Sequence, residues 1–297
     1  MEIGFVGLGK MGRAMAIRLK QKGHRVITYD VSLQVTGEAA RQGIKTVEEL
    51  KKLVAALKPP RNIWLMLPAG RIVDDVIFTG LVPYLQENDL IIDGGNSNYK
   101  DAQKRAIKLS KKSIEFMDIG VSGGIRGTDE GLSLMVGGSE EDYRRVEPVL
   151  RDLAADNGYA LLGANGAGHF VKTVHNGTEY ALMQSYAEGF ELLKEGPFEL
   201  DLEMVSRVWN NGSIVRSWLL ELIQQILQRE DLTAISGDVG GGQTGRWALE
   251  AAMENGVSCE MLAAALSQRY NSRRESFSNK MVAALRHEFG GHRLKKK

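Results

Sequence analysis

The sequence predicts an α/β fold: a doubly wound parallel sheet in the first part of the chain, followed by an all-α second part. Two observations predict it. Short apolar runs alternate with helical patterns as far as Leu162, which is typical of a parallel sheet with helices on both faces. Beyond the glycine-rich residues 163–168, helical spacing continues without a convincing strand. We therefore expect two domains, residues 1–165 and 166–297, with the boundary near residue 165.

The composition is that of a globular chain. It has 297 residues, 43% hydrophobic and 25% charged, which suits one large or two ordinary domains with a sizeable core. The net charge of +1 offers no bulk electrostatic case for nucleic-acid or membrane partners, and residues 295–297 (KKK) are expected to be a solvated end. No signal segment precedes the first strand pattern and no apolar run approaches the ~20 residues of a membrane span, so we expect a cytoplasmic protein. The single cysteine, Cys259, excludes an intrachain disulfide.

A glycine motif follows the first expected strand, residues 2–6. It reads Gly7-Leu8-Gly9-Lys10-Met11-Gly12 and opens a helix that we expect to end near Lys22. In G-x-G-x-x-G the first glycine permits a tight turn and the second lets the backbone approach a pyrophosphate. The third lets the helix pack closely, while the helix N-terminus faces the anion. A plain glycine turn is the alternative, but the strand–turn–helix context favours a Rossmann-type dinucleotide site formed by these six residues.

Asp30 bears on which dinucleotide binds. It ends the second expected strand, residues 25–29, where a ribose-binding carboxylate is expected about 20 residues beyond the motif. A carboxylate there accepts a hydrogen bond from the ribose 2′-OH and repels a 2′-phosphate, and residues 31–40 contain no Arg or Lys that could bind that phosphate. The sequence favours NAD over NADP.

The rest of the first part alternates in the same way. We expect helices at residues 46–57 (ended by Pro59-Pro60), 71–78, from 98 to about 111, and 140–153, and strands at 61–67, 89–93, 114–119, 132–136 and 159–162. Ligand-binding loops of such sheets leave the carboxyl ends of the strands. Three expected loops lie there, each of which could also be an ordinary turn: residues 68–70, 94–97 and 122–124. We expect Leu67, Pro68, Ala69 and Asn96 to contact the cofactor.

The second part reads as helices at residues 169–194, 201–209, 214–227, 244–254, 260–270 and about 275–287. Glycine-rich residues 237–247 divide it. They are either a flexible connector or a loop kept small so that backbone amides and Arg246 can meet an anion.

The first of these helices carries a polar stripe. His175, Asn176 and Glu179 follow Lys172 at offsets of 3, 4 and 7, so the four side chains share one helix face. The stripe is either a catalytic face that holds a base and a carboxylate or a solvated face with an ordinary Lys–Glu pair. Gly177 lies within the stripe and lowers the stability of the helix by ~1 kcal/mol relative to alanine. The missing side chain leaves space either for a ligand or for close helix packing.

Together these stretches resemble the β-hydroxyacid dehydrogenases, and within them the 6-phosphogluconate dehydrogenase family in a short form. The resemblance covers nearly the whole chain and is carried by the glycine motif (7–12), IIDGGNSNY (91–99), VSGG (121–124), GAGHFVKTVHNGTEY (166–180), WNNGSIVRSWLL (209–220), TGRW (244–247) and FGGH (289–292). It implies oxidative decarboxylation of 6-phosphogluconate to ribulose 5-phosphate and CO2 with reduction of NAD.

The resemblance also implies roles for residues. Lys172 matches the general base and Glu179 the general acid, and catalysis would also involve His175 and Asn176. Substrate-binding positions are matched by Asn96, Ser122, Gly123, Gly124, His175, Asn176, Tyr180, Arg269, Arg286 and His292. The last two belong to a tail that in the family reaches a neighbouring subunit, so a homo-oligomer is implied. Two positions depart from the family: a phosphate-binding lysine corresponds to about Gly242 or Gln243, and an acidic residue after SGG to Ile125.

The chemistry is consistent with that assignment. A lysine can take the C3 hydroxyl proton only when neutral, so we expect burial to lower the pKa of Lys172. Glu179 lies about 10 Å further along the helix, which suits protonation at a different carbon. The five histidines show no metal-ligand spacing, and no metal is expected. Two alternatives remain: a sister enzyme acting on 3-hydroxyisobutyrate or a semialdehyde, or a catalytically silent NAD-binding module.

Overall fold

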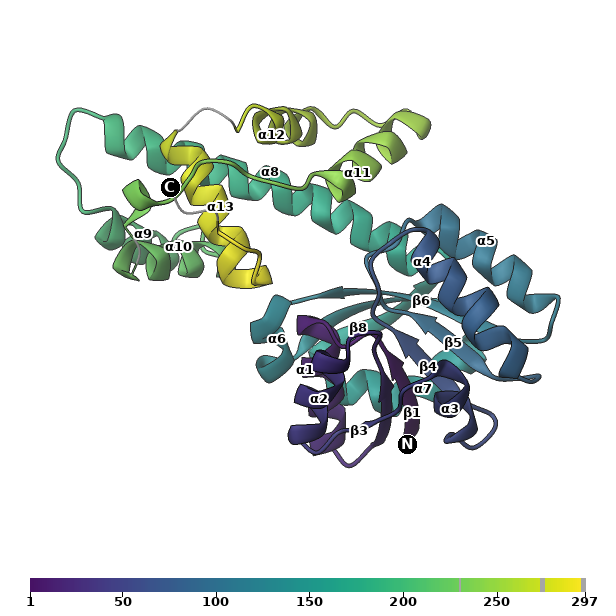
Figure 1. The fold of residues 1–297 in the computed structure, drawn as a ribbon. Coiled ribbons are helices and arrows are strands. Elements are labelled where there is room, and N and C mark those ends of the chain that lie inside the picture. The colour runs from purple at the N-terminus through teal and green to yellow at the C-terminus, as the bar shows by residue number, and fades with distance from the viewer. Residues whose placement is uncertain (230, 273–275, 295–297) are drawn as a thin grey trace. The chain divides into compact units, whose positions relative to one another are not determined.

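The structure is a computed structural model that describes residues 1–229, 231–272 and 276–294. The expected solvated end at residues 295–297 lies outside this part of the chain. Two compact units form, Met1–Lys172 and Thr173–Lys297. Helix α8 (Ala167–Glu195) contains the point of division (Figure 1).

The first unit is built on one sheet with the strand order β3-β2-β1-β4-β5-β6-β7-β8. Its strands are β1 (Glu2–Val6), β2 (Arg25–Tyr29), β3 (Lys45–Thr46), β4 (Asn62–Leu65), β5 (Leu90–Asp93), β6 (Glu115–Ser122), β7 (Leu132–Gly137) and β8 (Ala154–Gly163). The order reverses between β1 and β4, and ligands of such sheets bind at the carboxyl ends of strands at this reversal.

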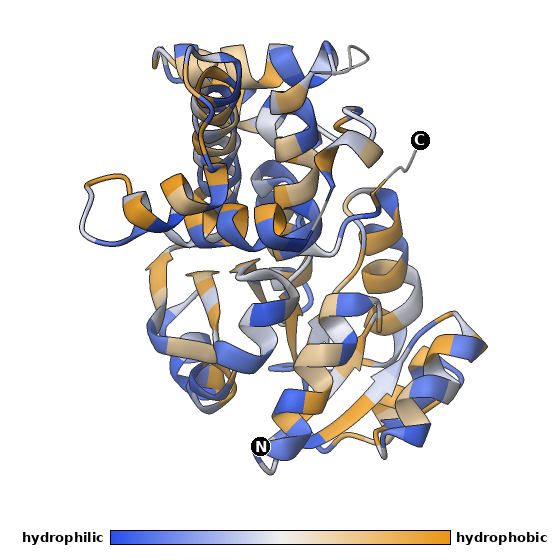
Figure 2. Cartoon of the chain, turned by 90° about the vertical axis from the view of Figure 1, so that its left-hand side faces the viewer, coloured by the Kyte–Doolittle hydropathy of each residue, from blue (hydrophilic) through white to orange (hydrophobic). Residues whose placement is uncertain are grey.

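Helices cover both faces of this sheet, as the alternation in the sequence predicts. They are α1 (Lys10–Gln21), α2 (Leu33–Arg41), α3 (Leu50–Ala55), α4 (Arg71–Asp74), which continues into η1 (Asp75–Leu81) and η2 (Val82–Tyr84), α5 (Tyr99–Ser110), α6 (Gly124–Glu130) and α7 (Glu140–Leu153). Successive strand residues point to opposite faces. Phe5 and Trp64 therefore join a core with α1 and α7, and Val6 and Ile63 join one with α3, α4 and α5. Figure 2 shows the apolar colour on strands and, alternating with the hydrophilic colour, along the helices.

The sheet is parallel through β6, but β7 runs antiparallel to β6 and β8 runs parallel to β7. The expectation of a parallel sheet was wrong for these last two strands. Only residues 123–131 link β6 to β7. A parallel crossover needs about a dozen residues or more, whereas an antiparallel neighbour can be reached by a short connection. The same loop holds helix α6, which the pattern did not reveal.

Smaller differences concern the region after β2. Helix α2 was not predicted, and Thr46 belongs to strand β3, so the helix expected at residues 46–57 is confined to Leu50–Ala55. Lys45 and Thr46 pair with Ile27 and Thr28 of β2. A two-residue edge strand is too short for an alternating pattern to indicate it.

The regular elements among the described residues of the second unit are all helices, which confirms the predicted fold class. The helices after α8 are α9 (Leu202–Asn210), α10 (Trp218–Arg229), the short η3 (Leu232–Ala234), α11 (Gln243–Glu254), α12 (Glu260–Tyr270) and α13 (Phe277–Gly290). Helix α10 begins at Trp218 rather than at Ile214, because the Ser217 hydroxyl caps it by accepting from the Leu220 N–H at 3.1 Å. No helix in the described ranges is long and apolar enough to span a membrane.

Candidate functional site

The glycine motif joins β1 to α1, and its three glycines have different surroundings. Gly7 has φ +94°, and a Cβ there would lie 2.4 Å from the Met66 carbonyl oxygen. A Cβ on Gly12 would lie 2.1 Å from the Gly7 carbonyl oxygen. Gly9 has nothing within 4 Å of its Cβ position. Gly7 and Gly12 are thus required by the fold, whereas the space beside Gly9 is available to a ligand.

Asp30 lies at the carboxyl end of β2, directly beside the motif. Its Oδ2 accepts from the Leu8 N–H at 2.7 Å, and its Oδ1 accepts from the Ser32 N–H at 2.8 Å. Each carboxylate oxygen can accept a second hydrogen bond. The nearby cation Arg13 is bonded to Glu38 of α2, which lowers the pKa of the Glu38 carboxyl. The charged groups that surround the motif therefore include two carboxylates.

The loops after β4 and β5 meet at the same edge of the sheet. Gly95 packs so closely on the loop after β4 that a Cβ would lie 2.5 Å from the Leu67 carbonyl oxygen, and Leu67 in turn lies beside Gly7. Pro68 and Ala69 continue that loop, and Asn96 is exposed immediately after Gly95. The structure thus brings the expected cofactor loops together around the reversal of strand order.

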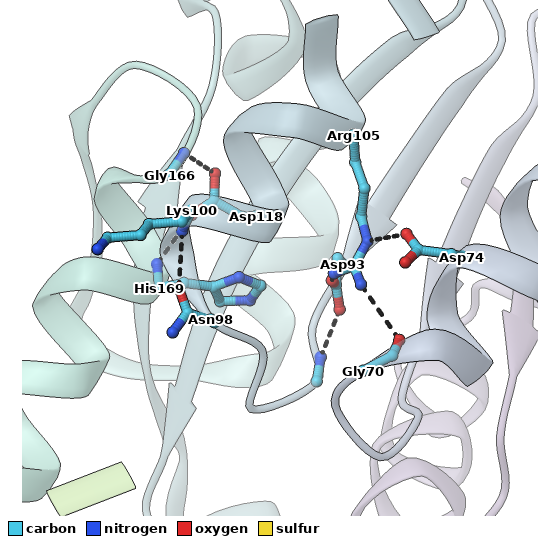
Figure 3. Close-up of polar contacts among 10 residues, drawn as sticks. Gly70, Asp74, Asp93, Asn98, Lys100, Arg105, Asp118, Gly166 and His169 are labelled. Carbon is cyan, nitrogen blue, oxygen red and sulfur yellow. Dashed lines mark hydrogen bonds and ion pairs between the residues drawn. The ribbon is translucent and has the colours of Figure 1, made fainter. Parts of the chain in front are cut away.

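A buried arginine that the sequence analysis missed holds these two loops. Arg105 of α5 is 1% exposed. It donates from Nη1 to Asp93 at 3.0 Å, from Nε to Asp74 at 2.8 Å and from Nη2 to the Gly70 carbonyl at 3.3 Å (Figure 3). The other oxygen of Asp93 accepts from the Gly95 N–H at 3.1 Å. A sequence signal existed, since Arg105 shares a helix face with the apolar Ala102 and Leu109.

Helix α8 buries most of the polar stripe instead of exposing it. Lys172 is 8% exposed and Asn176 7%, while the apolar Val174 on another face is 45% exposed. His175 Nδ1 and Glu179 Oε2 lie 3.7 Å apart, one turn along the helix. The stripe is therefore not the solvated face that the sequence left open.

Gly177 owes its place to helix packing. A Cβ at this position would lie 2.9 Å from Ala248 Cβ and 3.1 Å from Leu262 Cδ2. Of the two readings of Gly177, close packing against α11 and α12 accounts for the missing side chain.

Two arginines gather near Tyr180 in the second unit. The Arg269 guanidinium lies over the Tyr180 ring at 3.6 Å, is 5% exposed, and has no partner for Nη1 among the described residues. Burial lowers the pKa of Arg269 to about 10, with a further lowering by nearby Arg286 that Tyr180 and Glu179 partly offset. Burial also lowers the pKa of Arg286. Arg269 remains protonated near neutral pH, and a second arginine lies close to it, so this part of the unit suits an anion.

The glycine-rich loop before α11 lies against Arg286. Arg286 Nη1 donates to the Gly240 carbonyl at 2.6 Å, and a Cβ on Gly241 would lie 3.1 Å from Arg286 Nη2. Arg246 instead forms a helical ion pair with Glu250 at 3.3 Å. Thr244, which follows the loop, lies 3.2 Å from the Tyr180 hydroxyl through its Oγ1. The loop thus has a glycine where it passes Arg286, and Arg246 pairs with a residue of its own helix.

The remaining expected substrate residues lie at element ends. Ser122 ends β6, Gly123 precedes α6 with φ +116°, and Gly124 begins α6 with φ +58°. His292 is exposed after α13, and its ring lies 2.7 Å from the Cβ position of Gly290.

The first unit fits a bound dinucleotide. The open position at Gly9, the N-terminus of α1 and the carboxylate of Asp30 offer backbone approach, a partial positive charge and an acceptor for a ribose hydroxyl. Both units match families of known proteins. Residues 2–174 match the NAD binding domain of 6-phosphogluconate dehydrogenase, and residues 168–297 match the 6-phosphogluconate dehydrogenase C-terminal domain.

Individual relatives agree. A Haloferax volcanii protein named 6-phosphogluconate dehydrogenase, NAD(+)-dependent, decarboxylating, is 41% identical over 100% of this chain and 99% of its own length. A Bacillus subtilis protein of the same name is 36% identical over 91% of this chain but only 61% of its own length.

A solved 6-phosphogluconate dehydrogenase of Plasmodium falciparum is 31% identical with a TM-score of 0.86, covering 92% of this chain and 62% of that one. A Mycobacterium tuberculosis 3-hydroxyisobutyrate dehydrogenase, 24% identical with a TM-score of 0.77 over 94% and 97% of the two chains, shares the fold. This chain, with a dinucleotide-type glycine turn and a buried Lys–Asn stripe, belongs to the 6-phosphogluconate dehydrogenase family.

Proposed function

We propose that the protein catalyses the NAD-dependent oxidative decarboxylation of 6-phosphogluconate to ribulose 5-phosphate and CO2. The observation that carries the proposal is the burial of Lys172 and Asn176 on a helix that also holds Glu179. Full-length similarity to a protein named as an NAD(+)-dependent, decarboxylating 6-phosphogluconate dehydrogenase supports it.

We assign NAD to the glycine turn of the first unit. The backbone around Gly9 and the N-terminus of α1 would hold its pyrophosphate, and Asp30 would accept from its ribose hydroxyl. Bound NAD would supply the acceptor for the hydride that leaves C3 of the substrate. A 2′-phosphate would meet Asp30 and Glu38, with Arg13 already bonded to Glu38, so repulsion disfavours NADP.

Lys172 is the proposed general base at C3. Its burial disfavours the charged amine, and a neutral amine can take the hydroxyl proton as the C–H bond breaks. The resulting β-keto acid loses CO2 because the electrons of the C–C bond pass into the C3 carbonyl. The now protonated Lys172 stabilises the oxygen that becomes negative.

Glu179 is the proposed acid that delivers a proton to C1 of the enediol. It lies seven residues beyond Lys172, a rise of about 10 Å along α8. His175, 3.7 Å from Glu179, is in place to orient that carboxyl group, and Asn176 lies on the same face as Lys172. We propose Asn96, Ser122, Gly123 and Gly124 as further substrate contacts at strand ends of the first unit.

We propose that Arg269, Arg286 and Tyr180 bind the substrate phosphate, with His292 as a further ligand. The burial of Arg269, the lack of a partner for its Nη1 among the described residues, and the nearby Arg286 support this role. The lysine that the family carries in its glycine loop is absent here, and Arg286 supplies a cation against that loop. An anion there would offset the cost of burying two cations.

We further propose that the protein is a homo-oligomer in which the tail with Arg286 and His292 completes a neighbour's site. Domain swapping exchanges an identical element between subunits. An exchanged tail would make the same contacts with the neighbouring subunit that α13 makes within one chain. The hydrogen bond from Arg286 to the Gly240 carbonyl is one of them.

The first test is an assay of purified protein with 6-phosphogluconate and either NAD or NADP, following reduced nicotinamide by absorbance. We expect kcat/KM to be at least about tenfold higher with NAD, because like charges near a binding site cost several kcal/mol. Asp30→Asn, which removes the charge and keeps an acceptor, should narrow the preference. Turnover of 3-hydroxyisobutyrate instead, or no turnover with either cofactor, would refute the proposed function; a preference for NADP would refute the role of Asp30.

The second test concerns the base. Lys172→Met should lower kcat by roughly 10²–10⁴-fold, the usual contribution of a general base, while substrate and NAD still bind in equilibrium titrations. Lys194→Met is the matched control, since Lys194 lies on the same helix with its ammonium over the Phe277 ring, and it should retain wild-type turnover. Near-normal turnover of Lys172→Met would contradict the assignment.

The third test asks whose tail completes the site. Lys172→Met and Arg286→Ala should each be inactive alone. If the two variants are co-expressed, pair at random as dimers and exchange tails, half of the dimers are mixed and each mixed dimer holds one intact site. The mixture should then recover about a quarter of wild-type activity. Lys172→Met mixed with Glu179→Gln is the control, because both changes lie on α8 and cannot complement each other. If the first mixture is as inactive as its components, the tail serves its own chain.

A further inference from the structure

The first turn of α8 is capped by a residue from a distant strand. Asp118 of β6 accepts from the Gly166 N–H at 2.5 Å through Oδ1 and from the His169 N–H at 2.8 Å through Oδ2 (Figure 3). The first N–H groups of a helix have no partner within it, so this carboxylate satisfies two of them. Its negative charge also lies at the positive end of the helix dipole.

The Asp118 side chain is fully buried, at 0% exposed. Burial raises the pKa of its carboxyl, and nearby Asp93 raises it further, whereas His169 and the two backbone donors lower it. A buried carboxylate that loses a hydrogen-bond partner is costly. The cap therefore ties the start of α8 to the centre of the sheet.

Gly120 lies two residues beyond Asp118 on the same face of β6, directly against Lys172. A Cβ on Gly120 would lie 2.3 Å from Lys172 Cβ and 2.9 Å from the Gly168 carbonyl oxygen. A Cβ on Gly168 would in turn lie 2.3 Å from the Asp118 carbonyl oxygen and 2.5 Å from that of Met135 on β7. Helix and sheet thus touch backbone to backbone, and the first turn of α8 has no room to shift toward the strands.

We propose that Asp118 and Gly120 are positioning residues for the base: the carboxylate fixes the first turn of α8, and the missing side chain at position 120 fixes the depth of Lys172. The lysine stem has four flexible carbons, so the place of its amine depends on where Cα and Cβ are held. A misplacement of about 1 Å at a reacting group can cost a hundredfold in rate. This inference rests on the proposed function of Lys172.

The test compares Asp118→Asn and Gly120→Ala with wild type. An asparagine accepts one N–H but turns an N–H₂ group toward the other donor, while an alanine at 120 pushes against Lys172. Turnover of 6-phosphogluconate is expressed per cofactor site, counted by NADH fluorescence titration, so unfolded protein does not enter the rate. We expect kcat per titrated site to fall by about a hundredfold in both variants, with unchanged affinity for NADH.

Matched controls separate positioning from general loss of stability. Asp142→Asn changes another buried carboxyl, at the start of α7, whose pKa burial also raises. Gly37→Ala adds a methyl group where nothing lies within 4 Å. Both should keep wild-type kcat per site.

The outcomes distinguish the two proposals. Wild-type protein without turnover refutes the proposed function and this inference with it. If wild type turns over, either variant that binds NADH and keeps kcat within about tenfold overturns the positioning role alone. Loss of NADH binding in both variants also overturns it, because the contacts then serve the fold of the first unit and not the base.

Discussion

Burial of a lysine at the start of α8 is the constraint on which the rest of the proposed site depends. An amine out of water is less readily charged, and the proposed role of Lys172 as a base needs it neutral. Holding it there requires a helix that begins against the sheet, and glycines at positions 120, 137 and 168 let backbones approach where side chains would clash. The Asp118 carboxylate caps this helix by accepting from the Gly166 and His169 N–H groups.

A second buried charged side chain, Arg105, holds the cofactor loops in a similar way. Arg105 reaches Asp93, Asp74 and the Gly70 carbonyl, and so ties the ends of β4 and β5 to α5. A buried ion pair is weak support for stability, since burying two charges costs as much as pairing them returns. What these groups contribute is a fixed place for loops at the ligand edge of the sheet. Asp118 likewise fixes the first turn of α8.

Local patterns predicted the elements and their class. The glycine motif, the alternation of strands and helices, and the length of α7 could all be read from the sequence, because each depends on neighbours along the chain. The antiparallel β7 could not, since α6 was hidden in a glycine-rich loop whose short length decides the strand direction. Asp118 and Arg105 were missed because their partners are distant in sequence, and the burial of Lys172 runs against the amphipathic pattern of α8. The proposed exchange of tails between chains would likewise depend on assembly, which local patterns do not carry.

We propose that the two ends of the α8 stripe serve different carbons of the substrate: Lys172 the carbon that is oxidised, and Glu179 the carbon that is protonated. A single-turnover experiment with Glu179→Gln tests it most directly, by following reduced nicotinamide through absorbance and ribulose 5-phosphate by rapid quench in the same reaction. If the roles are separate, reduced nicotinamide forms at close to the wild-type rate, while ribulose 5-phosphate appears roughly 10²–10⁴-fold more slowly, the usual loss for a missing general acid. If both signals slow by the same factor, the carboxylate acts already at the oxidation step and the separation of roles is wrong.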